Sequence, residues 1–324
     1  MAVMRYALTG ATGFVGGELT RQLVEAGHEV VALVRTPSRA DALTALGVEL
    51  VEGDLDSDEA LDRLLDGADG LFHVAGWYRL GDRDTSAGRR VNVEGTRNVL
   101  SAALRAGTPR TVYTSTLAIN SDTGGAMRDE TYRHTGDHLT EYDRTKAQAH
   151  EIAHELFRRG LPVVTVMPGA VYGAGDTSQV GELFAQVVAG RRVQVPGGGG
   201  TLMWAHVGDV ARGHVLAMER GVPGEDYMLA GEPATLAGVL QQVATIAGTR
   251  GPMRVPATLI RLTEKAMTPV AKVLPVPATY SPESLRASLA SYTGSRAKAE
   301  RDLVWQCRPL VEGLRETVAA LRAD

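Results

Sequence analysis

The sequence predicts an α/β fold, with a Rossmann-type doubly wound parallel sheet and a smaller, mainly helical C-terminal part. Two observations predict it. Short apolar segments alternate with longer amphipathic ones through the first half of the 324-residue chain, which is typical of consecutive βαβ units. A glycine-rich turn also joins the first strand-like segment to the first helix-like one, as in the first βα unit of such sheets.

The elements of the expected sheet follow from this alternation. The apolar segments that have the pattern of strands are residues 5–9, 29–34, 49–52, 70–74, 111–115 and 163–167. The segments between them place apolar residues at helical spacing. They predict helices over residues 14–26, 38–46, 57–65, 91–106 and 142–159.

The pattern becomes irregular beyond Pro168. Residues 197–200 predict a flexible glycine loop, 207–220 a helix and 226–229 a last short strand, and the chain from Leu236 is mainly helical with several prolines. We therefore expect a Rossmann domain over residues 1–167, to which 207–230 return. Residues 168–206 and 231–324 are expected to form a substrate-capping domain.

The composition is that of a soluble globular protein, with 44% hydrophobic and 22% charged residues. A net charge of −4 offers no argument for binding nucleic acid or an anionic membrane. The single cysteine, Cys307, excludes an internal disulfide and suits a reducing compartment. Because a signal-peptide pattern and an apolar run of membrane-spanning length are both lacking, we expect a cytoplasmic protein.

The glycine-rich turn has the sequence TGATGFVG over residues 9–16. Gly10 permits a tight turn, Gly13 lets the backbone approach a phosphate, and Gly16 lets the helix pack on the strand. Backbone N–H groups and the helix dipole then favour an anion at the helix start. The turn predicts a dinucleotide site, unless it is a strand–turn–helix connection without a ligand. The expected contacts are Gly10, Thr12, Gly13, Phe14, Val15 and Gly16.

Tyr142 and Lys146 form a YxxxK pair, which places both side chains on one face of a helix. A free tyrosine has a pKa of about 10, and a neighbouring ammonium group lowers that value. The pair therefore predicts proton transfer by Tyr142 that is tuned by Lys146. The alternative is a solvated Tyr and Lys on an amphipathic helix.

These motifs, with several others in a fixed order, resemble the extended type of the short-chain dehydrogenase/reductase superfamily, which includes NAD-dependent epimerases and dehydratases. The nearest branches are dihydroflavonol-reductase-like ketoreductases and the hopanoid-associated epimerase group. The motifs that carry the resemblance are TGATGFVG at 9–16, Asp54-Leu55, HVAG at 73–76, VNVEGTRN around Asn92, TST at 114–116, YDRTK at 142–146, PGAVYG at 168–173 and HVGDV at 206–210.

The resemblance implies roles for further residues. Asp54 binds the adenine amino group and Leu55 packs on its ring, although Asp54 could instead cap a helix. Asn92 lies beneath the nicotinamide half or caps its helix. The catalytic hydroxyl is Thr116, with Ser115 as the alternative. The remaining implied cofactor contacts are Ala75, Gly76, Pro168 and Val171, together with Tyr142 and Lys146, of which Lys146 holds the nicotinamide ribose. A homodimer formed through the helices 91–106 and 142–159 is also implied.

The end of the second predicted strand indicates which dinucleotide is bound. NAD sites place a carboxylate about 20 residues after the glycine turn, and residues 32–39 contain none. A guanidinium suits the 2′-phosphate of NADP. We therefore expect NADP, bound by Arg35 first and Arg39 second, with NAD as second choice. Arg35 could alternatively be a solvated charge.

The sequence thus predicts a cytoplasmic enzyme that uses NADPH to reduce a small-molecule ketone or aldehyde. The alternatives are a sugar-nucleotide epimerase or dehydratase that retains NAD, and a catalytically idle nucleotide sensor. Trp77, Tyr78, Arg79 and Trp204 are candidates to overhang the substrate. Residues 257–276 form either an apolar substrate entrance or the core helix of the smaller domain.

Metal chemistry is not expected from the histidines. The pairs His134/His138 and His150/His154 have the i,i+4 spacing that can hold a metal ion. Neither pair has a recognisable third ligand nearby in the sequence, so we expect no metal.

Overall fold

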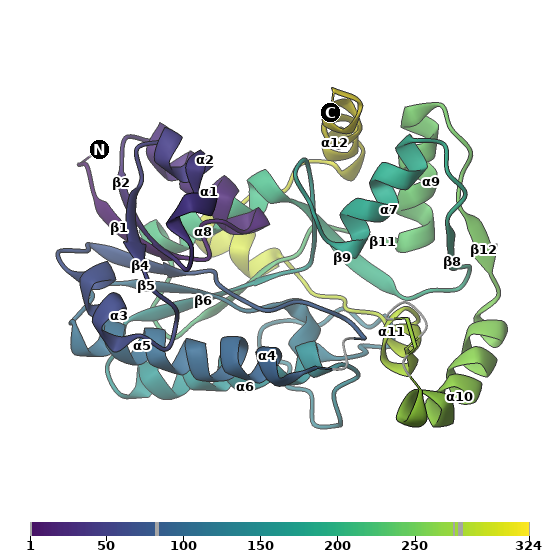
Figure 1. Ribbon diagram of the computed structural model, residues 1–324, viewed down its shortest axis with the longest axis horizontal. Coiled ribbons are helices and arrows are strands. Elements are labelled where there is room, and N and C mark those ends of the chain that lie inside the picture. Colours follow the sequence, from purple (N-terminus) through teal and green to yellow (C-terminus); the bar gives the residue numbers. More distant parts are fainter. Residues whose placement is uncertain (1, 82–83, 275, 278–280, 324) are drawn as a thin grey trace.

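A parallel sheet of seven strands forms the centre of the computed structural model, which describes residues 2–81, 84–274, 276–277 and 281–323. The strand order is β10-β6-β5-β4-β1-β2-β3, so the order reverses between β1 and β4 (Figure 1). Ligands of doubly wound sheets bind at such a reversal point. The strands are β1 (Arg5–Thr9), β2 (Glu29–Val34), β3 (Glu49–Glu52), β4 (Gly70–His73), β5 (Thr111–Thr114), β6 (Val163–Pro168) and β10 (Asp226–Leu229).

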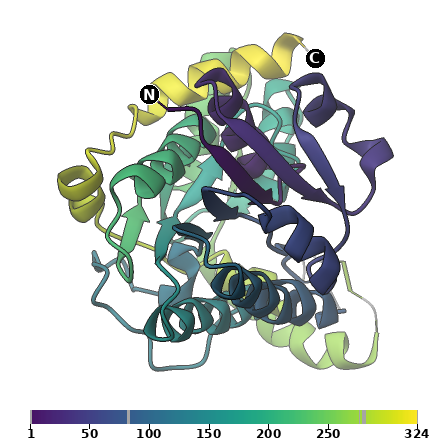
Figure 2. The same cartoon turned by 90° about the vertical axis from the view of Figure 1, so that its left-hand side faces the viewer.

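Helices cover both faces of this sheet (Figure 1). One face is covered by α1 (Phe14–Glu25), α2 (Asp41–Ala45) and α8 (Val207–Arg220), whose apolar residues join one core cluster with β1 and β4. The other face is covered by α3 (Asp58–Leu65), α5 (Thr96–Arg105) and α6 (Glu141–Arg158), which form a second cluster. Turned by 90°, the blue-to-teal α5 and α6 lie side by side below the strands (Figure 2).

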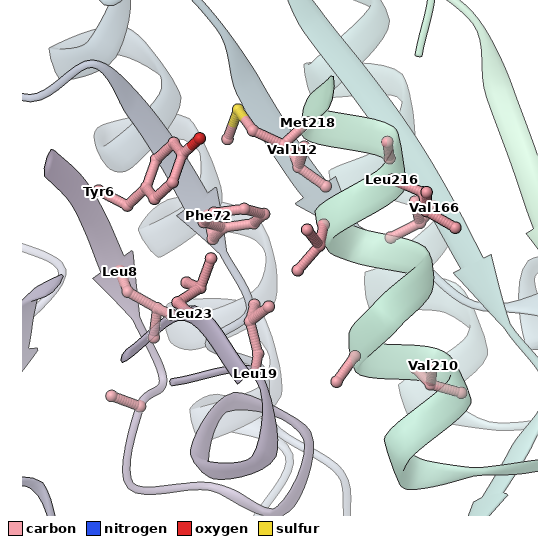
Figure 3. Close-up of a cluster of buried hydrophobic side chains, with 14 of the residues drawn as sticks. Tyr6, Leu8, Leu19, Leu23, Phe72, Val112, Val166, Val210, Leu216 and Met218 are labelled. Carbon is pink, nitrogen blue, oxygen red and sulfur yellow. The ribbon is translucent and has the colours of Figure 1, made fainter. Parts of the chain in front are cut away.

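The core beneath α1 and α8 shows why these helices are amphipathic. Leu19 and Leu23 of α1 and Phe72 of β4 are almost completely buried, and they pack toward α8, which lies beside α1 on the same face of the sheet (Figure 3). Burying each such side chain stabilises the fold by about 1.5–3 kcal/mol before the loss of chain entropy. The expected doubly wound sheet is therefore confirmed, and α8 and β10 lie on it.

Two predicted helices differ from the observed ones. The expected helix 38–46 is a 3₁₀ turn, Pro37–Arg39, followed by the short α2. The expected helix 91–106 begins earlier, as the short α4 (Ser86–Gly88) and a π-helical segment, Arg89–Gly95, which continues into α5. Such π segments are rare and sequence periodicity does not reveal them.

The C-terminal part has its own core and two small sheets, whose strand orders are β11-β9-β7 and β12-β8. Sequence patterning missed these strands, all but one of which have only three or four residues. They are β7 (Ala170–Tyr172), β8 (Gln194–Pro196), β9 (Thr201–His206), β11 (Glu232–Thr235) and β12 (Met253–Val255). The helices are α7 (Gln179–Val188), α9 (Leu236–Ala247), α10 (Ala257–Val273), α11 (Pro282–Ala287) and α12 (Leu310–Ala323).

Helix α10 is not a core helix. Leu259 and Leu262 are 52% and 64% exposed, and Ile260 is the single buried residue among those of α10 whose side chains are described. The interpretation of 257–276 as the core of the smaller domain is therefore wrong. Within the described ranges, no helix combines the length and apolar character that crossing a bilayer requires.

Candidate active site

The glycine-rich turn lies against the end of the neighbouring strand β4. Gly10 has a φ of +83°, and a Cβ at this position would lie 2.6 Å from the backbone nitrogen of Ala75. A Cβ at Gly16 would overlap the carbonyl oxygen of Gly10. Both positions therefore require glycine, since the turn, the first helix and β4 approach one another too closely for any side chain.

The start of α1 is suited to hold a phosphate. Its N-cap is Gly13, so no side chain caps the helix, and its first turn contains no acidic residue. The first N–H groups of a helix carry partial positive charge and have no partner inside the helix. Thr12 and Gly13 are exposed at this point, while Phe14 and Val15 are half-buried. The residues present thus fit the pyrophosphate of a dinucleotide.

The ends of β2 and β3 carry the residues expected to bind the adenosine part. Arg35 and Arg39 both lie just beyond β2 and are exposed. Asp54 is also exposed, and its carboxylate accepts a hydrogen bond of 2.8 Å from the Leu55 backbone. Leu55 is buried against Gly95, where a Cβ would lie 2.7 Å from its Cδ1. Parallel pairing brings these strand ends to one edge of the sheet.

Asn92 braces the segment that follows β4. Its side chain is fully buried, and its Oδ1 accepts from the backbone nitrogen of Trp77 at 2.7 Å. Its Nδ2 donates to the carbonyl oxygen of Trp77 and to the Thr145 hydroxyl, both at 3.0 Å. Gly76 lies beside it, with a Cβ position 4.0 Å from the Lys146 Nζ. Asn92 therefore ties the loop after β4 to α6.

Lys146 is buried on α6 and directed at the end of β5. Its Nζ donates to the carbonyl oxygen of Thr114 at 2.6 Å and lies 4.8 Å from the centre of the Tyr113 ring. Burial lowers the pKa of Lys146 to about 7, because an ammonium group loses its hydration there.

Tyr142 lies one helical turn before Lys146 and is half-buried. Its ring meets that of Tyr78 edge-on, with 4.8 Å between the centroids. Burial raises the pKa of Tyr142 above the ordinary value of 10.0, and the neighbouring Thr116 hydroxyl opposes this only in part. The predicted lowering of this pKa by Lys146 is wrong for this structure, because the desolvation of the phenol dominates and the Lys146 ammonium is directed at Thr114.

The two candidate hydroxyls point to different partners. Thr116 caps the 3₁₀ turn Leu117–Asn120, accepts from the Ala118 backbone at 3.2 Å and lies close enough to Tyr142 to lower the pKa of its phenol. The Ser115 hydroxyl instead lies 3.0 Å from Nδ1 of His150. Thr116 is thus the hydroxyl beside Tyr142.

The remaining expected residues divide into two groups. Pro168 ends β6, and Val171 follows in β7 at half burial. Tyr78 contacts Tyr142, as an overhanging residue should. Trp204 does not overhang the site, because it is 1% exposed and packs on Phe184 in the C-terminal core. That expectation was wrong, since β9 alternates its side chains and turns Trp204 inward.

Sequence reasoning missed a link between the C-terminal part and α6. The Tyr292 hydroxyl donates to the Asp143 carboxylate at 3.0 Å, and the Glu283 carboxylate accepts from the backbone nitrogen of Glu141 at 2.7 Å. Burial raises the pKa of Asp143 to about 6. These contacts join residues more than 140 positions apart, so no local signal could have revealed them.

Comparison with known proteins agrees with this geometry. A model of the NAD dependent epimerase/dehydratase family matches residues 6–230. A Synechocystis protein named as a dihydroflavonol 4-reductase is 38% identical over 286 residues, which cover 84% of this chain and 82% of that protein. Sterol demethylase protein B of Methylococcus capsulatus is 34% identical over 264 residues, or 80% and 79% of the two chains.

The fold is also similar to solved structures. The crystal structure of gox2253 superposes with a TM-score of 0.87 and 32% sequence identity, over 99% of this chain and 98% of that one. The agreement extends over the seven-stranded sheet and the C-terminal part alike.

Proposed function

Since the chain belongs to the NAD-dependent epimerase/dehydratase family and is an oxidoreductase of that family, we propose that it reduces a ketone or aldehyde with NADPH. The resemblance to extended short-chain dehydrogenases/reductases is confirmed by the matched relatives. The observation that carries the proposal is the convergence of Tyr142, Lys146 and Thr116 at the end of β5.

The proposed proton donor is Tyr142. With a pKa above its ordinary 10.0, the phenol is protonated at neutral pH, as an unshifted tyrosine also is, and this is the state that a general acid requires. The Thr116 hydroxyl lies beside the Tyr142 phenol and is proposed to donate to the same substrate oxygen. Lys146 restrains the end of β5 through Thr114 and adds positive charge nearby when protonated. The nicotinamide, when bound, supplies the hydride.

We propose that the cofactor is NADP. The turn from Gly10 to Gly16 would hold the pyrophosphate, and Asp54 and Leu55 the adenine. Arg35 supports NADP over NAD, because it is exposed at the end of β2 and has no ion-pair partner among the described residues. A guanidinium binds a phosphate by paired charged hydrogen bonds. Ala75, Gly76, Pro168 and Val171 are the proposed contacts of the nicotinamide half, and Asn92 is proposed to support them by holding the loop after β4 in place.

The substrate that we propose is an apolar carbonyl compound of polycyclic or lipid-like character. The names of the relatives, a sterol demethylase protein and a dihydroflavonol reductase, support this class. So do the Tyr78 ring against Tyr142 and the exposed Leu259 and Leu262 of α10. Residues 168–206 and 231–324 are proposed to cap this substrate, with Tyr292 and Glu283 holding the cap against α6.

A second candidate function is epimerisation or dehydration with a retained NAD, which the name of the family itself favours. Mass spectrometry of the nucleotide released from freshly purified, denatured protein distinguishes the two. NADP(H), or a site that takes up NADPH reversibly, supports the reductase. Stoichiometric NAD⁺ would replace it with the epimerase or dehydratase. Reversible NADPH binding then directs a screen of cyclic ketones by the loss of NADPH absorbance.

A further inference from the structure

Three potential metal ligands meet between the later turns of α6 and the edge strand β10. His150 and His154 lie four residues apart on α6 and face Asp226, the first residue of β10. The two Nε2 atoms are 3.0 Å apart, and each lies 3.2 Å from Oδ2 of Asp226. His150 and Asp226 are only 1% and 4% exposed, so the cluster is not a surface coincidence.

The spacing of these three atoms matches tetrahedral zinc coordination. Zinc bonds to histidine nitrogen and carboxylate oxygen at about 2.0–2.2 Å, which separates tetrahedral ligand atoms by roughly 3.3 Å. The three observed distances between the candidate ligand atoms, 3.0, 3.2 and 3.2 Å, are close to that value. An ion at bonding distance from all three atoms would lie just outside their plane and leave a fourth position open.

The environment of His150 resembles that of a metal ligand. Its second ring nitrogen, Nδ1, lies 3.0 Å from the Ser115 hydroxyl. Ligating histidines usually bind an outer partner through the ring nitrogen that does not face the metal, which fixes the ring orientation. Donation of the Nδ1 proton to Ser115 leaves the Nε2 lone pair directed at the cluster.

Room for a fourth ligand exists on the solvent side. His154 and Asp226 line a cavity of about 550 Å³ together with acidic and basic residues, among them Glu130 and Arg133. The Arg133 Nη2 lies 3.4 Å from Oδ2 of Asp226 and is the group that competes with a cation there. Its side chain is 50% exposed and can turn into water, whereas the Lys298 ammonium pairs with Glu225 and the Asp226 carbonyl.

We propose that His150, His154 and Asp226 bind one divalent transition-metal ion of the Zn²⁺ class, with solvent as the fourth ligand. Two imidazoles and a carboxylate in tetrahedral arrangement favour Zn²⁺ over the oxygen-preferring Mg²⁺ and Ca²⁺. The ion ties α6, which carries Tyr142 and Lys146, to the edge strand of the sheet. The other pair, His134 and His138, has no such third ligand among the described residues.

The test is a Zn²⁺ titration of tag-free, chelator-stripped protein against a chromophoric zinc chelator. Wild type is expected to bind one Zn²⁺ per chain. His154→Gln and Asp226→Asn should each weaken binding at least tenfold, whereas the matched control His134→Gln should leave it unchanged. Arg133→Gln should strengthen binding several-fold, because the competing cation is gone. Circular dichroism verifies that each variant is folded.

A second measurement keeps the proposal decidable if a cluster variant fails to fold. Co²⁺ bound to wild type should produce the visible absorption of a tetrahedral centre, and Zn²⁺ should displace it and raise the melting temperature. The proposal is overturned if stripped wild type binds Zn²⁺ no better than His154→Gln, or if His134→Gln weakens binding as much. An octahedral Co²⁺ spectrum overturns it as well. Each outcome is independent of the proposed reductase activity.

Discussion

The two halves of helix α6 both contact the end of β5, but they differ in the residues that they bring together there. In the first half, Tyr142 and Lys146 contact Thr116 and Thr114. In the second half, His150 contacts Ser115, and with His154 it faces Asp226 on β10. If the proposed functions hold, the start of this helix serves proton transfer and its later turns anchor it to the sheet.

The difference between the halves arises from what faces each one. The first half faces the loop after β4 and the C-terminal part, where Tyr78 and Tyr292 meet it. The second half faces the edge of the sheet, where a buried carboxylate is available. A helix presents i and i+4 on one face, so the function of each pair is decided by its neighbours and not by its spacing.

The largest expected effect is on Tyr142. Tyr142→Phe removes the proposed proton donor, so kcat should fall by about 10²- to 10⁴-fold, the usual contribution of a general acid. Affinity for NADPH should change little, since the phenyl ring keeps its contact with Tyr78. Steady-state kinetics with cofactor fluorescence titration measure both. Nearly full turnover in this variant would remove Tyr142 from the chemistry.

The next effect separates the two hydroxyls. Thr116→Val should lower kcat by roughly 10²- to 10³-fold, as loss of one preorganised donor does. Ser115→Ala should leave kcat almost unchanged and lower the stability by about 1 kcal/mol, because its hydrogen bond serves His150. Denaturant unfolding and kinetics on the same samples provide the comparison. If Ser115→Ala instead lowers kcat and Thr116→Val lowers only the stability, Thr116 is not the catalytic hydroxyl beside Tyr142.

A substitution of Arg35, which lies outside α6, provides a reference for the variants in both halves of that helix. Arg35→Asp should weaken NADPH binding by roughly 10- to 100-fold, the equivalent of one charged hydrogen-bonded contact. NADH binding should change little. Isothermal titration with both dinucleotides measures this, with Arg39→Asp as the matched control that we expect to act more weakly. Equal losses for NADPH and NADH would exclude a 2′-phosphate contact.

The smallest effect concerns stability and pH in the cofactor-free protein. The pKa of Lys146 falls from its ordinary 10.5 to about 7 on folding. Between these values the unfolded chain binds more protons, so the contribution of Lys146 to stability is greatest above the upper value and falls as the pH falls toward 7. The melting temperature of Lys146→Met minus that of wild type should therefore be more positive at about pH 7 than at about pH 10. A difference that does not vary with pH contradicts the lowered pKa.

The sequence alone determined the sheet, the turn and the order of the motifs. Alternating apolar segments and the Gly10–Gly16 spacing are local properties, and β1, β2 and β3 have the predicted bounds because each is a short apolar segment between turn residues. Tyr142 and Lys146 could be paired in advance for the same reason, since helical spacing places them on one face.

Only the tertiary structure decided which residues meet across long separations. It directed Thr116 to Tyr142 and Ser115 to His150, placed Asp226 beside two histidines more than 70 positions earlier, and buried Trp204 in a second core. It also raised the pKa of Tyr142, where sequence reasoning expected a lower value. These outcomes depend on desolvation and on contacts between distant elements, which chain folding creates and local sequence patterns do not contain.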